Sequence, residues 1–236
     1  MQALEAVLEP PDADLMVCVS HEGGTALTLE AARAFRGPKW LVTGRAESPL
    51  GEVSEKVIVC TPEIERSWCH TASYTCAIAA IAALRGEDVS WLPDAVATAL
   101  RDPVEPPAQN RVVIAGAGRD LATAHEAALK LREGAYLAAE AHETEQLLHG
   151  HLAAVDETVR AYVLEGEGRA AERARDAVRA LEELGCETTL VATSHPVVDI
   201  VRFQLLTVDL AADRGVDPDV IRRDDPRWQR ARDAYA

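Results

Sequence analysis

Apolar runs of strand length alternate with helix-like segments along most of the chain, and this alternation restricts the fold more than any other feature. The run 15–19 is continuously apolar, as expected for a parallel strand that is buried on both faces. Similar runs follow at 40–43 and 56–60, and helix-like segments occupy 26–35 and 67–84. Since alternating strands and helices favour parallel strands covered by helices, we predict an α/β fold with parallel sheets flanked by helices.

The alternation restarts after residues 102–110, where three prolines in nine residues are typical of a linker. We expect further strands at 111–115, 161–164 and 188–192, helices at 93–101, 121–141, 170–184 and 197–214, and an irregular charged tail from 216. The sequence therefore predicts two units, 1–104 and 105–236. The first offers only three strands before its long helix and is the shorter of the two.

The composition excludes several classes of partner. Lys and Arg number 24 against 39 Asp and Glu, a net charge of −15 in 236 residues, and such a surface repels nucleic acids and anionic lipids. No apolar run approaches the roughly 20 residues of a membrane-spanning helix, and the first residues lack the pattern of a signal peptide. Five cysteines without a CxxC pair indicate free thiols, so we expect a cytoplasmic protein without membrane contacts.

A small-residue loop between the first predicted strand and the next helix is one candidate for ligand binding. Its residues are Ser20, His21, Glu22, Gly23, Gly24 and Thr25. Backbone N–H groups and hydroxyls at a helix start can bind an anion. A plain turn with Thr25 as the helix N-cap explains the same residues, and the carboxylate of Glu22 disfavours an anion.

Three charged residues, Glu126, Lys130 and Glu133, share one face of a predicted helix. Glu–Lys pairs at this spacing are most often exposed ion pairs that contribute about 0.3–0.5 kcal/mol. If the face closes a pocket instead, Glu133 can transfer a proton and Lys130 can keep it ionised.

Two further segments could contribute to a site. His149-Gly150-His151 can supply an acid or a base near neutral pH or can be exposed, and its spacing is a poor signature for zinc. The segment from Glu65 to Thr71 begins a predicted helix, whose N–H groups can bind the hydroxyls of a ligand while Trp68 offers a flat face to a sugar ring. A capped helix with Trp68 in the core is the alternative.

The run Glu126-Ala-Ala-Leu-Lys130-Leu-Arg-Glu133, followed 16 residues later by His149-Gly150, is similar to a motif of the sugar isomerase (SIS) domain family. That motif reads E-G-A-L-K-L-K-E, then H-G at the same distance. The pattern is closest to tandem SIS proteins, namely the isomerase half of glucosamine-fructose-6-phosphate aminotransferase and related phosphosugar isomerases. The resemblance covers nearly the whole chain and implies two SIS-type units.

The resemblance also implies roles for particular residues. Glu133 would move a proton between C1 and C2 of an open-chain sugar, Lys130 would lie beside the reacting oxygens, and His149 would assist ring opening from the neighbouring subunit of a homodimer. A sugar or sugar phosphate would be the substrate, with no cofactor and no metal. The residues implied to bind it are Ser20, His21, Glu22, Gly23, Thr25, Trp68, Cys69 and Glu126.

Departures from the family pattern leave alternatives open. Glu22 replaces a phosphate-binding serine and His21 replaces a glutamine, while the family's first strand–helix unit is not seen, so the first unit is N-terminally shortened. The tail 216–236 contains no lysine where the aminotransferase has an essential one, which excludes glucosamine-6-phosphate synthesis by this chain alone. A phosphosugar isomerase, an isomerase for a neutral or amino sugar, and a non-catalytic sugar-binding or regulatory protein all stay open.

Overall fold

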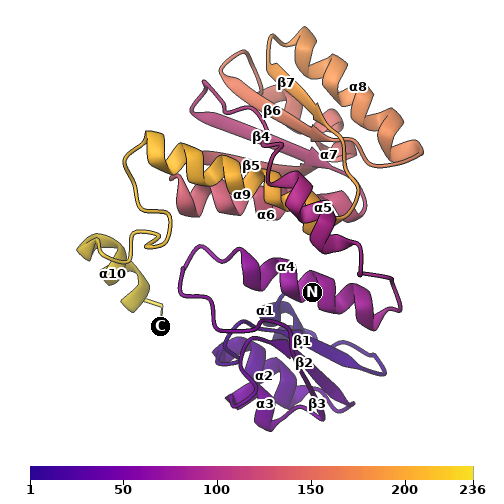
Figure 1. The fold of residues 1–236 in the computed structure, drawn as a ribbon, viewed down its shortest axis with the longest axis vertical. Coiled ribbons are helices and arrows are strands. Elements are labelled where there is room, and N and C mark those ends of the chain that lie inside the picture. Colours follow the sequence, from indigo (N-terminus) through magenta and orange to yellow (C-terminus); the bar gives the residue numbers. More distant parts are fainter. Residues whose placement is uncertain (236) are drawn as a thin grey trace. The chain divides into compact units, whose positions relative to one another are not determined.

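The computed structural model describes residues 1–235 and divides into two compact units (Figure 1). The first contains Met1–Arg66 and His70–Ser90, and the second contains Ser67–Cys69 and the chain from Trp91 onward. Helix α5 (Leu92–Ala99) groups with the second unit because it packs on α9 (Pro196–Asp213). The division after residue 90 thus precedes the prolines, and the assignment of 1–104 and 105–236 to two SIS repeats stays a prediction.

A three-stranded parallel sheet in the order β1-β2-β3 forms the first unit. Its elements are α1 (Ala3–Leu8), β1 (Met16–Val19), α2 (Ala26–Ala34), β2 (Lys39–Thr43), α3 (Pro49–Glu52), β3 (Lys56–Val59) and α4 (Ala72–Leu84). The apolar core between sheet and helices includes Cys18, Ala32, Leu41 and Leu50. The three predicted strands are confirmed, whereas the short helices α1 and α3 were not predicted.

Strand β1 differs from its predicted burial. Cys18 points into the core, but Val17 and Val19 are 43% and 49% exposed. The expectation that both faces are covered is wrong, since only the face that carries Cys18 is packed in this strand, which also lies at the edge of the sheet with β2 as its paired neighbour. An apolar run alone does not distinguish an edge strand from a central one.

The second unit is built on a four-stranded parallel sheet in the order β5-β4-β6-β7. Besides α5 and α9, its elements are β4 (Arg111–Gly116), α6 (Arg119–Gly134), β5 (Ala138–Glu143), α7 (Thr144–His149), the 3-10 helix η1 (His151–Ala154), β6 (Val159–Leu164), α8 (Arg169–Glu183), β7 (Glu187–Val191) and α10 (Pro226–Asp233). Every residue of the central strand β6 is buried, as expected of a parallel strand covered on both faces. The predicted α/β fold with parallel sheets flanked by helices is confirmed.

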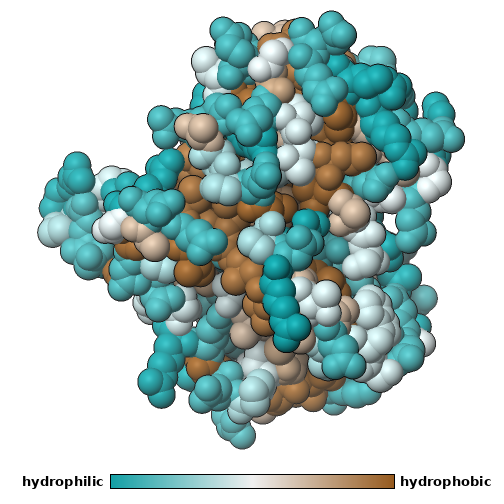
Figure 2. Space-filling model, turned by 45° about the horizontal axis from the view of Figure 1, so that its top comes forward, coloured by the Kyte–Doolittle hydropathy of each residue, from teal (hydrophilic) through white to brown (hydrophobic). Residues whose placement is uncertain are grey.

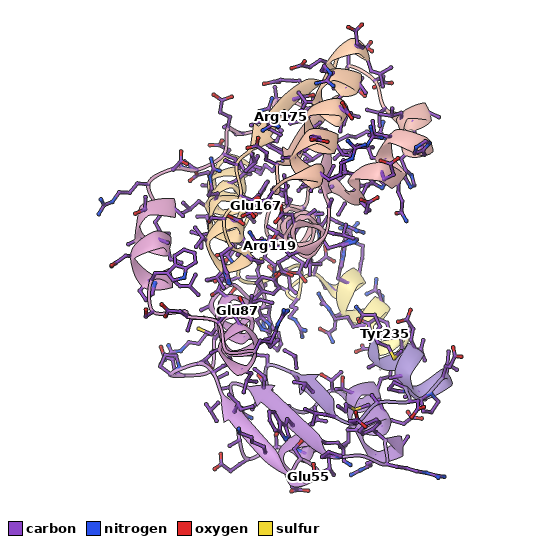
Figure 3. All side chains as sticks on the ribbon, turned by 90° about the vertical axis from the view of Figure 1, so that its right-hand side faces the viewer. Glu55, Glu87, Arg119, Glu167, Arg175 and Tyr235 are labelled. Atoms are coloured by element: carbon purple, nitrogen blue, oxygen red, sulfur yellow. The ribbon has the colours of Figure 1, made fainter. Side chains whose placement is uncertain are left out.

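Polar contacts connect the loops at one end of this sheet. Arg119, at the start of α6, lies beside Glu167, which precedes α8, with their charged groups 3.3 Å apart (Figure 3). Arg119 also donates a hydrogen bond to the carbonyl oxygen of Ser194, which precedes α9. The starts of α6, α8 and α9 are therefore held together by the side chain of Arg119.

Helix α6 positions the candidate site, and it is shorter than predicted. The expected helix over 121–141 ends at Gly134, and residues 138–143 form the parallel edge strand β5. A Cβ on Gly134 would lie 2.5 Å from the Thr207 side chain of α9, so only glycine allows this close approach. The expected irregular tail also contains a helix, α10, which was not predicted.

Among the described residues, no helix combines the length and the apolar character required to cross a membrane.

Candidate functional site

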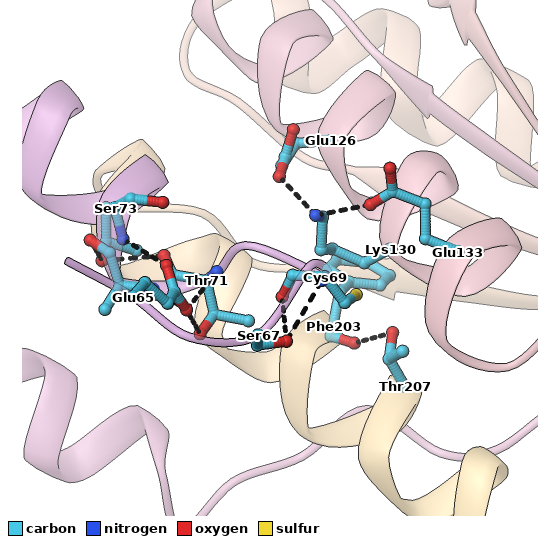
Figure 4. Close-up of polar contacts among 12 residues, drawn as sticks. Glu65, Ser67, Cys69, Thr71, Ser73, Glu126, Lys130, Glu133, Phe203 and Thr207 are labelled. Atoms are coloured by element: carbon cyan, nitrogen blue, oxygen red, sulfur yellow. Dashed lines mark hydrogen bonds and ion pairs between the residues drawn. The ribbon is translucent and has the colours of Figure 1, made fainter. Parts of the chain in front are cut away.

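Two acidic residues of α6, Glu126 and Glu133, converge on the buried ammonium of Lys130 (Figure 4). Its Nζ donates a hydrogen bond to Glu133 Oε2 at 2.8 Å and lies 3.4 Å from Glu126 Oε1. The side chain of Lys130 is 3% exposed, against 13% for Glu126 and 27% for Glu133. The exposed ion pair that sequence spacing alone would favour is therefore not formed, and Glu133 is the member of the triad that reaches the surface.

Burial and charge act in opposite directions on this triad. Burial alone would lower the pKa of Lys130, but Glu126 and the hydrogen bond to Glu133 outweigh it, so the pKa is raised and the ammonium is retained. The Glu126 carboxyl is the more deeply buried of the two acids, and burial raises its pKa although Lys130 partly opposes the shift. Among the described residues, Glu133 Oε1 accepts no hydrogen bond, so this oxygen is free to contact a ligand.

The short segment Ser67–Cys69 belongs to the same unit and lies next to Lys130 (Figure 4). Cys69 is buried, and this burial raises the pKa of its thiol to about 11 although Lys130 opposes the shift. The thiol is therefore protonated near neutral pH, and its contact with a substrate stays a prediction. Trp68 is 46% exposed rather than in the core, and the Arg223 guanidinium lies 3.5 Å from the centre of its ring.

The start of α4 differs from the expectation that its N–H groups bind a ligand. The helix begins at Ala72 rather than at residue 67, and its first N–H groups are already occupied. Glu65 accepts hydrogen bonds from the backbone N–H groups of Thr71, Ala72 and Ser73 at 2.8–3.1 Å. A carboxylate at this position satisfies the donors that a helix start leaves unpaired. These N–H groups are therefore occupied by Glu65, and a ligand-binding role for the segment stays a prediction.

Replacing Glu65 with glutamine is expected to destabilise the first unit by about 1–2 kcal/mol, the usual effect of removing a helix cap. Partial burial alone would raise the pKa of Glu65, but hydrogen bonds from Ser73 and Thr71 lower it from 4.5 to about 2. Because the folded pKa is depressed, the carboxylate stabilises the fold above pH 4.5, and this contribution is lost as the pH falls toward 2.

Urea unfolding at several pH values measures the difference in the free energy of unfolding between wild type and Glu65→Gln. Replacing the exposed Glu63 nearby with glutamine is the control and should change stability by less than about 0.5 kcal/mol. The stabilities of wild type and Glu65→Gln should converge in acid. If the two stabilities differ by the same amount at every pH, the Glu65 carboxylate does not stabilise the start of α4 through its charge.

The loop predicted to bind phosphate is internally hydrogen-bonded. Ser20 Oγ accepts from the N–H of Gly23 at 3.2 Å and lies 3.3 Å from Thr25 Oγ1. Thr25 is the N-cap residue of α2, although its side chain makes no capping hydrogen bond. Gly23 has φ +68°, a backbone conformation that favours glycine. A Cβ there would also lie 2.1 Å from Ser48 Oγ, so close packing by itself is enough to require this glycine.

His21 and Glu22 have different surroundings within the loop. Both ring nitrogens of His21 are buried without a hydrogen-bond partner among residues 1–235, and its ring centre lies 4.3 Å from that of His70. The Glu22 carboxylate is half-exposed and 3.9 Å from the Arg45 guanidinium. Such an exposed pair contributes little to stability, and its distance leaves the negative charge in the loop largely uncompensated.

The two histidines of the His149-Gly150-His151 segment point to different neighbours. His149 ends α7, its side chain is 76% exposed, and its Nε2 lies 2.8 Å from Glu145 Oε1. The His151 ring stacks on His142 of β5 with centres 4.2 Å apart. Sequence reasoning missed this stack because residues 138–141 were expected to continue a helix.

Comparisons with known proteins agree with this architecture. Residues 108–218 match the family model of the SIS domain, so the second unit contains an SIS domain and the family resemblance of the α6 motif is confirmed. Among curated relatives, the isomerizing glutamine–fructose-6-phosphate aminotransferase of Pyrobaculum aerophilum is 27% identical over 252 aligned positions. That alignment covers 87% of this chain but 42% of the relative, so the chain spans less than half of that protein's length.

Solved structures with a similar fold include two proteins described as enzymes of sugar phosphates. Glucosamine-6-phosphate deaminase from Thermotoga maritima has a TM-score of 0.76 at 19% identity, with 92% of this chain and 77% of that chain covered. Tagatose-6-phosphate ketose/aldose isomerase from Escherichia coli has a TM-score of 0.77 at 17% identity, with 94% and 75% covered. At these identities the likeness concerns the fold alone.

Proposed function

We propose that the chain is an isomerase of phosphorylated sugars that uses Glu133 as its catalytic base. The observation that carries this proposal is the arrangement on α6, where a buried ammonium holds one oxygen of Glu133 and leaves the other free. The relatives and the proteins of similar fold are described as enzymes that act on sugar phosphates, which supports the same class of substrate.

The reaction proposed is the interconversion of an aldose and a ketose, or of the corresponding amino sugars, through an enediol. The Glu133 carboxylate takes the proton from C2 of the open-chain aldose, and the electrons of that C–H bond form the C1–C2 double bond. The resulting carboxylic acid returns the proton to C1, while the proton on O2 moves to O1. Lys130 stabilises the negative charge that develops on these oxygens, and Glu126 keeps Lys130 in place.

His149 is proposed to assist ring opening in the site of a neighbouring subunit. Its exposed position at the end of α7 is compatible with a contact to a second chain. Glu145, which lies 2.8 Å from its Nε2, orients the imidazole as carboxylates commonly do for catalytic histidines. This role requires a homodimer in which each site combines Glu133 of one chain with His149 of the other.

Mixing two inactive variants tests this shared site. Glu133→Gln and His149→Ala homodimers should each be nearly inactive, whereas random exchange of subunits should restore about a quarter of the wild-type activity, because half of the dimers then contain one intact site of two. Activity after dissociation and reassociation is the measurement. If the mixture stays inactive while dimers do exchange, His149 does not act across the interface.

The loop Ser20–Thr25 is proposed to contact the substrate through Ser20, Gly23 and Thr25, and Glu22 is expected to weaken its affinity for phosphate. Replacing Glu22 with serine removes a negative charge and adds a hydroxyl donor, so binding of a sugar phosphate should become about tenfold tighter. Calorimetric titration measures the change, with Glu47→Ser, an exposed acidic residue outside the loop, as control. Unchanged affinity in Glu22→Ser would separate this loop from the phosphate.

A non-catalytic sugar-binding protein is the second candidate, and the half-exposed Glu22 carboxylate favours it because it weakens the binding of phosphate. His21 and Glu22 could equally hydrogen-bond the hydroxyls or the amine of an unphosphorylated sugar, which would indicate an isomerase for a modified substrate. Thermal-shift measurements with phosphorylated and unphosphorylated sugars, followed by an isomerase assay on each ligand found, distinguish these functions. Binding without turnover over hours would favour the non-catalytic protein.

A further inference from the structure

Histidines from three elements of the second unit gather around the edge strand β5, and the proposed reaction uses none of them. His142 lies on β5, His151 on η1 and His125 on α6. The rings of His142 and His151 are stacked, with their centres 4.2 Å apart and their planes 29° apart. His125 is near enough to influence the protonation of His142. The stack joins the edge of the sheet to the turn that follows His149.

The turn that follows His149 is weakly structured by itself. It begins after Gly150 and consists of the 3-10 helix η1, in which none of the four residues is buried. Such turns have poorer hydrogen-bond geometry than α-helices. Leu152 packs against the core of the unit, and Arg111 donates a hydrogen bond to the carbonyl oxygen of Ala154 at 3.2 Å. The stack of His151 on His142 is therefore one of the contacts that hold the turn on the sheet.

The start of α7, at the other side of His149, is fixed by different contacts. Glu143 caps the helix by accepting hydrogen bonds from the backbone N–H groups of Glu145 and Gln146. Glu145 also forms an ion pair with Arg173 of α8 at 2.8 Å. Helix α8 packs on α7, and its outer surface is mainly hydrophilic, as the upper right of Figure 2 shows. His149 thus lies between a fixed helix start and a turn whose position depends on the stack.

The surroundings of His142 disfavour a charge on its ring. Burial lowers the pKa of His142, and the neighbouring His151 lowers it further, as His125 does to a smaller extent. Glu140 of the same strand opposes this shift, but its side chain is 61% exposed and lies 3.4 Å from Nε2. Strand β4 places the uncharged Ala115 opposite His142. Two protonated rings at this separation would therefore repel each other without a buried carboxylate between them.

The sign of the pH dependence follows from the direction of this shift. Because the folded pKa of His142 lies below its ordinary value of 6.5, the neutral ring stabilises the stacked arrangement fully above pH 6.5. This contribution is lost as the pH falls through the lowered pKa, since an unstacked His142 takes up a proton more readily than a stacked one. Mild acid therefore favours separation of the two rings.

We propose that the stack of His142 on His151 is a pH-sensitive contact, which holds the segment of His149 on the sheet at neutral pH and releases it in mild acid. His142 and His151 are positioning residues, since they act on His149 through the turn at Gly150. Its effect on catalysis rests on the proposed function, in which His149 assists ring opening. The release of the segment itself does not depend on that function.

Hydrogen exchange of the full chain without ligand, measured by mass spectrometry at about pH 7.5 and about pH 5.5, tests the contact. Labelling times are scaled for the intrinsic pH dependence of exchange. In wild type, the protection of residues 149–155 should fall about five- to tenfold in acid, because the released segment binds one more proton at an ordinary histidine pKa. The buried strand β6 should stay equally protected and reports global unfolding.

Variants separate the charge of the stack from its packing. His142→Phe keeps an aromatic ring without a titratable group, so the protection of 149–155 should change less than about twofold between the two pH values. His151→Ala removes the stacked ring at an exposed position, where the fold should tolerate it, and should lower protection already at neutral pH. His125→Gln replaces an exposed histidine outside the stack and is the matched control, which should keep the pH dependence of wild type.

The proposal is overturned if wild type protects residues 149–155 equally at both pH values, if β6 loses protection to the same extent, or if His142→Phe keeps the change seen in wild type. Activity is a separate readout: where isomerisation is detected, His142→Phe should retain it to lower pH than wild type. If Glu133→Gln keeps full activity while the exchange results hold, the proposed reaction fails and the pH-sensitive contact stands.

Discussion

Replacing Glu133 with glutamine is expected to reduce the rate of isomerisation at least about a hundredfold, because positioned acid–base groups usually contribute 10²–10⁴-fold. Glutamine keeps the size of the side chain and can still accept the hydrogen bond from Lys130 Nζ. It cannot take a proton from carbon. The variant should therefore fold, and bind the sugar, nearly as well as wild type.

Turnover, ligand affinity and thermal stability measured on the same preparations separate these effects. Glu183→Gln, an exposed position on α8 outside the site, is the matched control and should retain wild-type turnover. A Glu133→Gln enzyme that keeps more than about a tenth of the wild-type rate would remove Glu133 from the role of base. A variant that loses sugar binding to the same extent as turnover would assign Glu133 to binding instead.

Replacing Lys130 with methionine is expected to destabilise the second unit by about 3 kcal/mol, because it leaves the buried carboxylate of Glu126 without its counter-charge. Lys130 lowers the pKa of Glu126, so its removal raises that pKa further. A carboxyl with a raised folded pKa costs stability as it ionises. The destabilisation should therefore be largest at neutral pH and should shrink as the pH falls through the pKa of Glu126.

Urea unfolding followed by far-UV circular dichroism measures the loss of stability in Lys130→Met. Lys56→Met, an exposed lysine of β3, is the matched control and should change stability by less than about 1 kcal/mol. The double variant Lys130→Met with Glu126→Gln should recover a substantial part of the loss, since no buried charge is then left unpaired. Equal stability of Lys130→Met and wild type would mean that Glu126 is uncharged in the native protein.

The sequence predicts most strands of the four-stranded sheet because buried parallel strands are the most apolar segments of the chain. The strands β4, β6 and β7 begin within two residues of their predicted starts. The edge strand β5 was missed because its sequence, Ala-Ala-Glu-Ala-His-Glu, consists mostly of good helix formers. Its pairing with β4, together with Tyr136 at positive φ, ends the helix there, and both are tertiary effects.

The candidate site could be predicted in part. Spacing places Glu126, Lys130 and Glu133 on one face of a helix, and the resemblance to the family motif predicts that this face is functional. Spacing does not reveal that Glu126 is the more buried acid, because this depends on how the elements around α6 pack. The hydrogen bond from the N–H of Arg222 to the hydroxyl of Tyr136 could not be predicted either, since it requires the tail to return to the end of α6.

Hydrogen exchange at the reacting carbons gives the most direct test of Glu133 as the base. A base that carries a proton between C1 and C2 exchanges it with solvent, so wild type in heavy water should replace hydrogen at one of these carbons with deuterium. Proton NMR of a series of 6-phosphorylated aldoses and ketoses measures this. We predict exchange in at least one sugar with wild type and none with Glu133→Gln. Exchange at equal rates in both proteins, or in neither, would contradict the assignment.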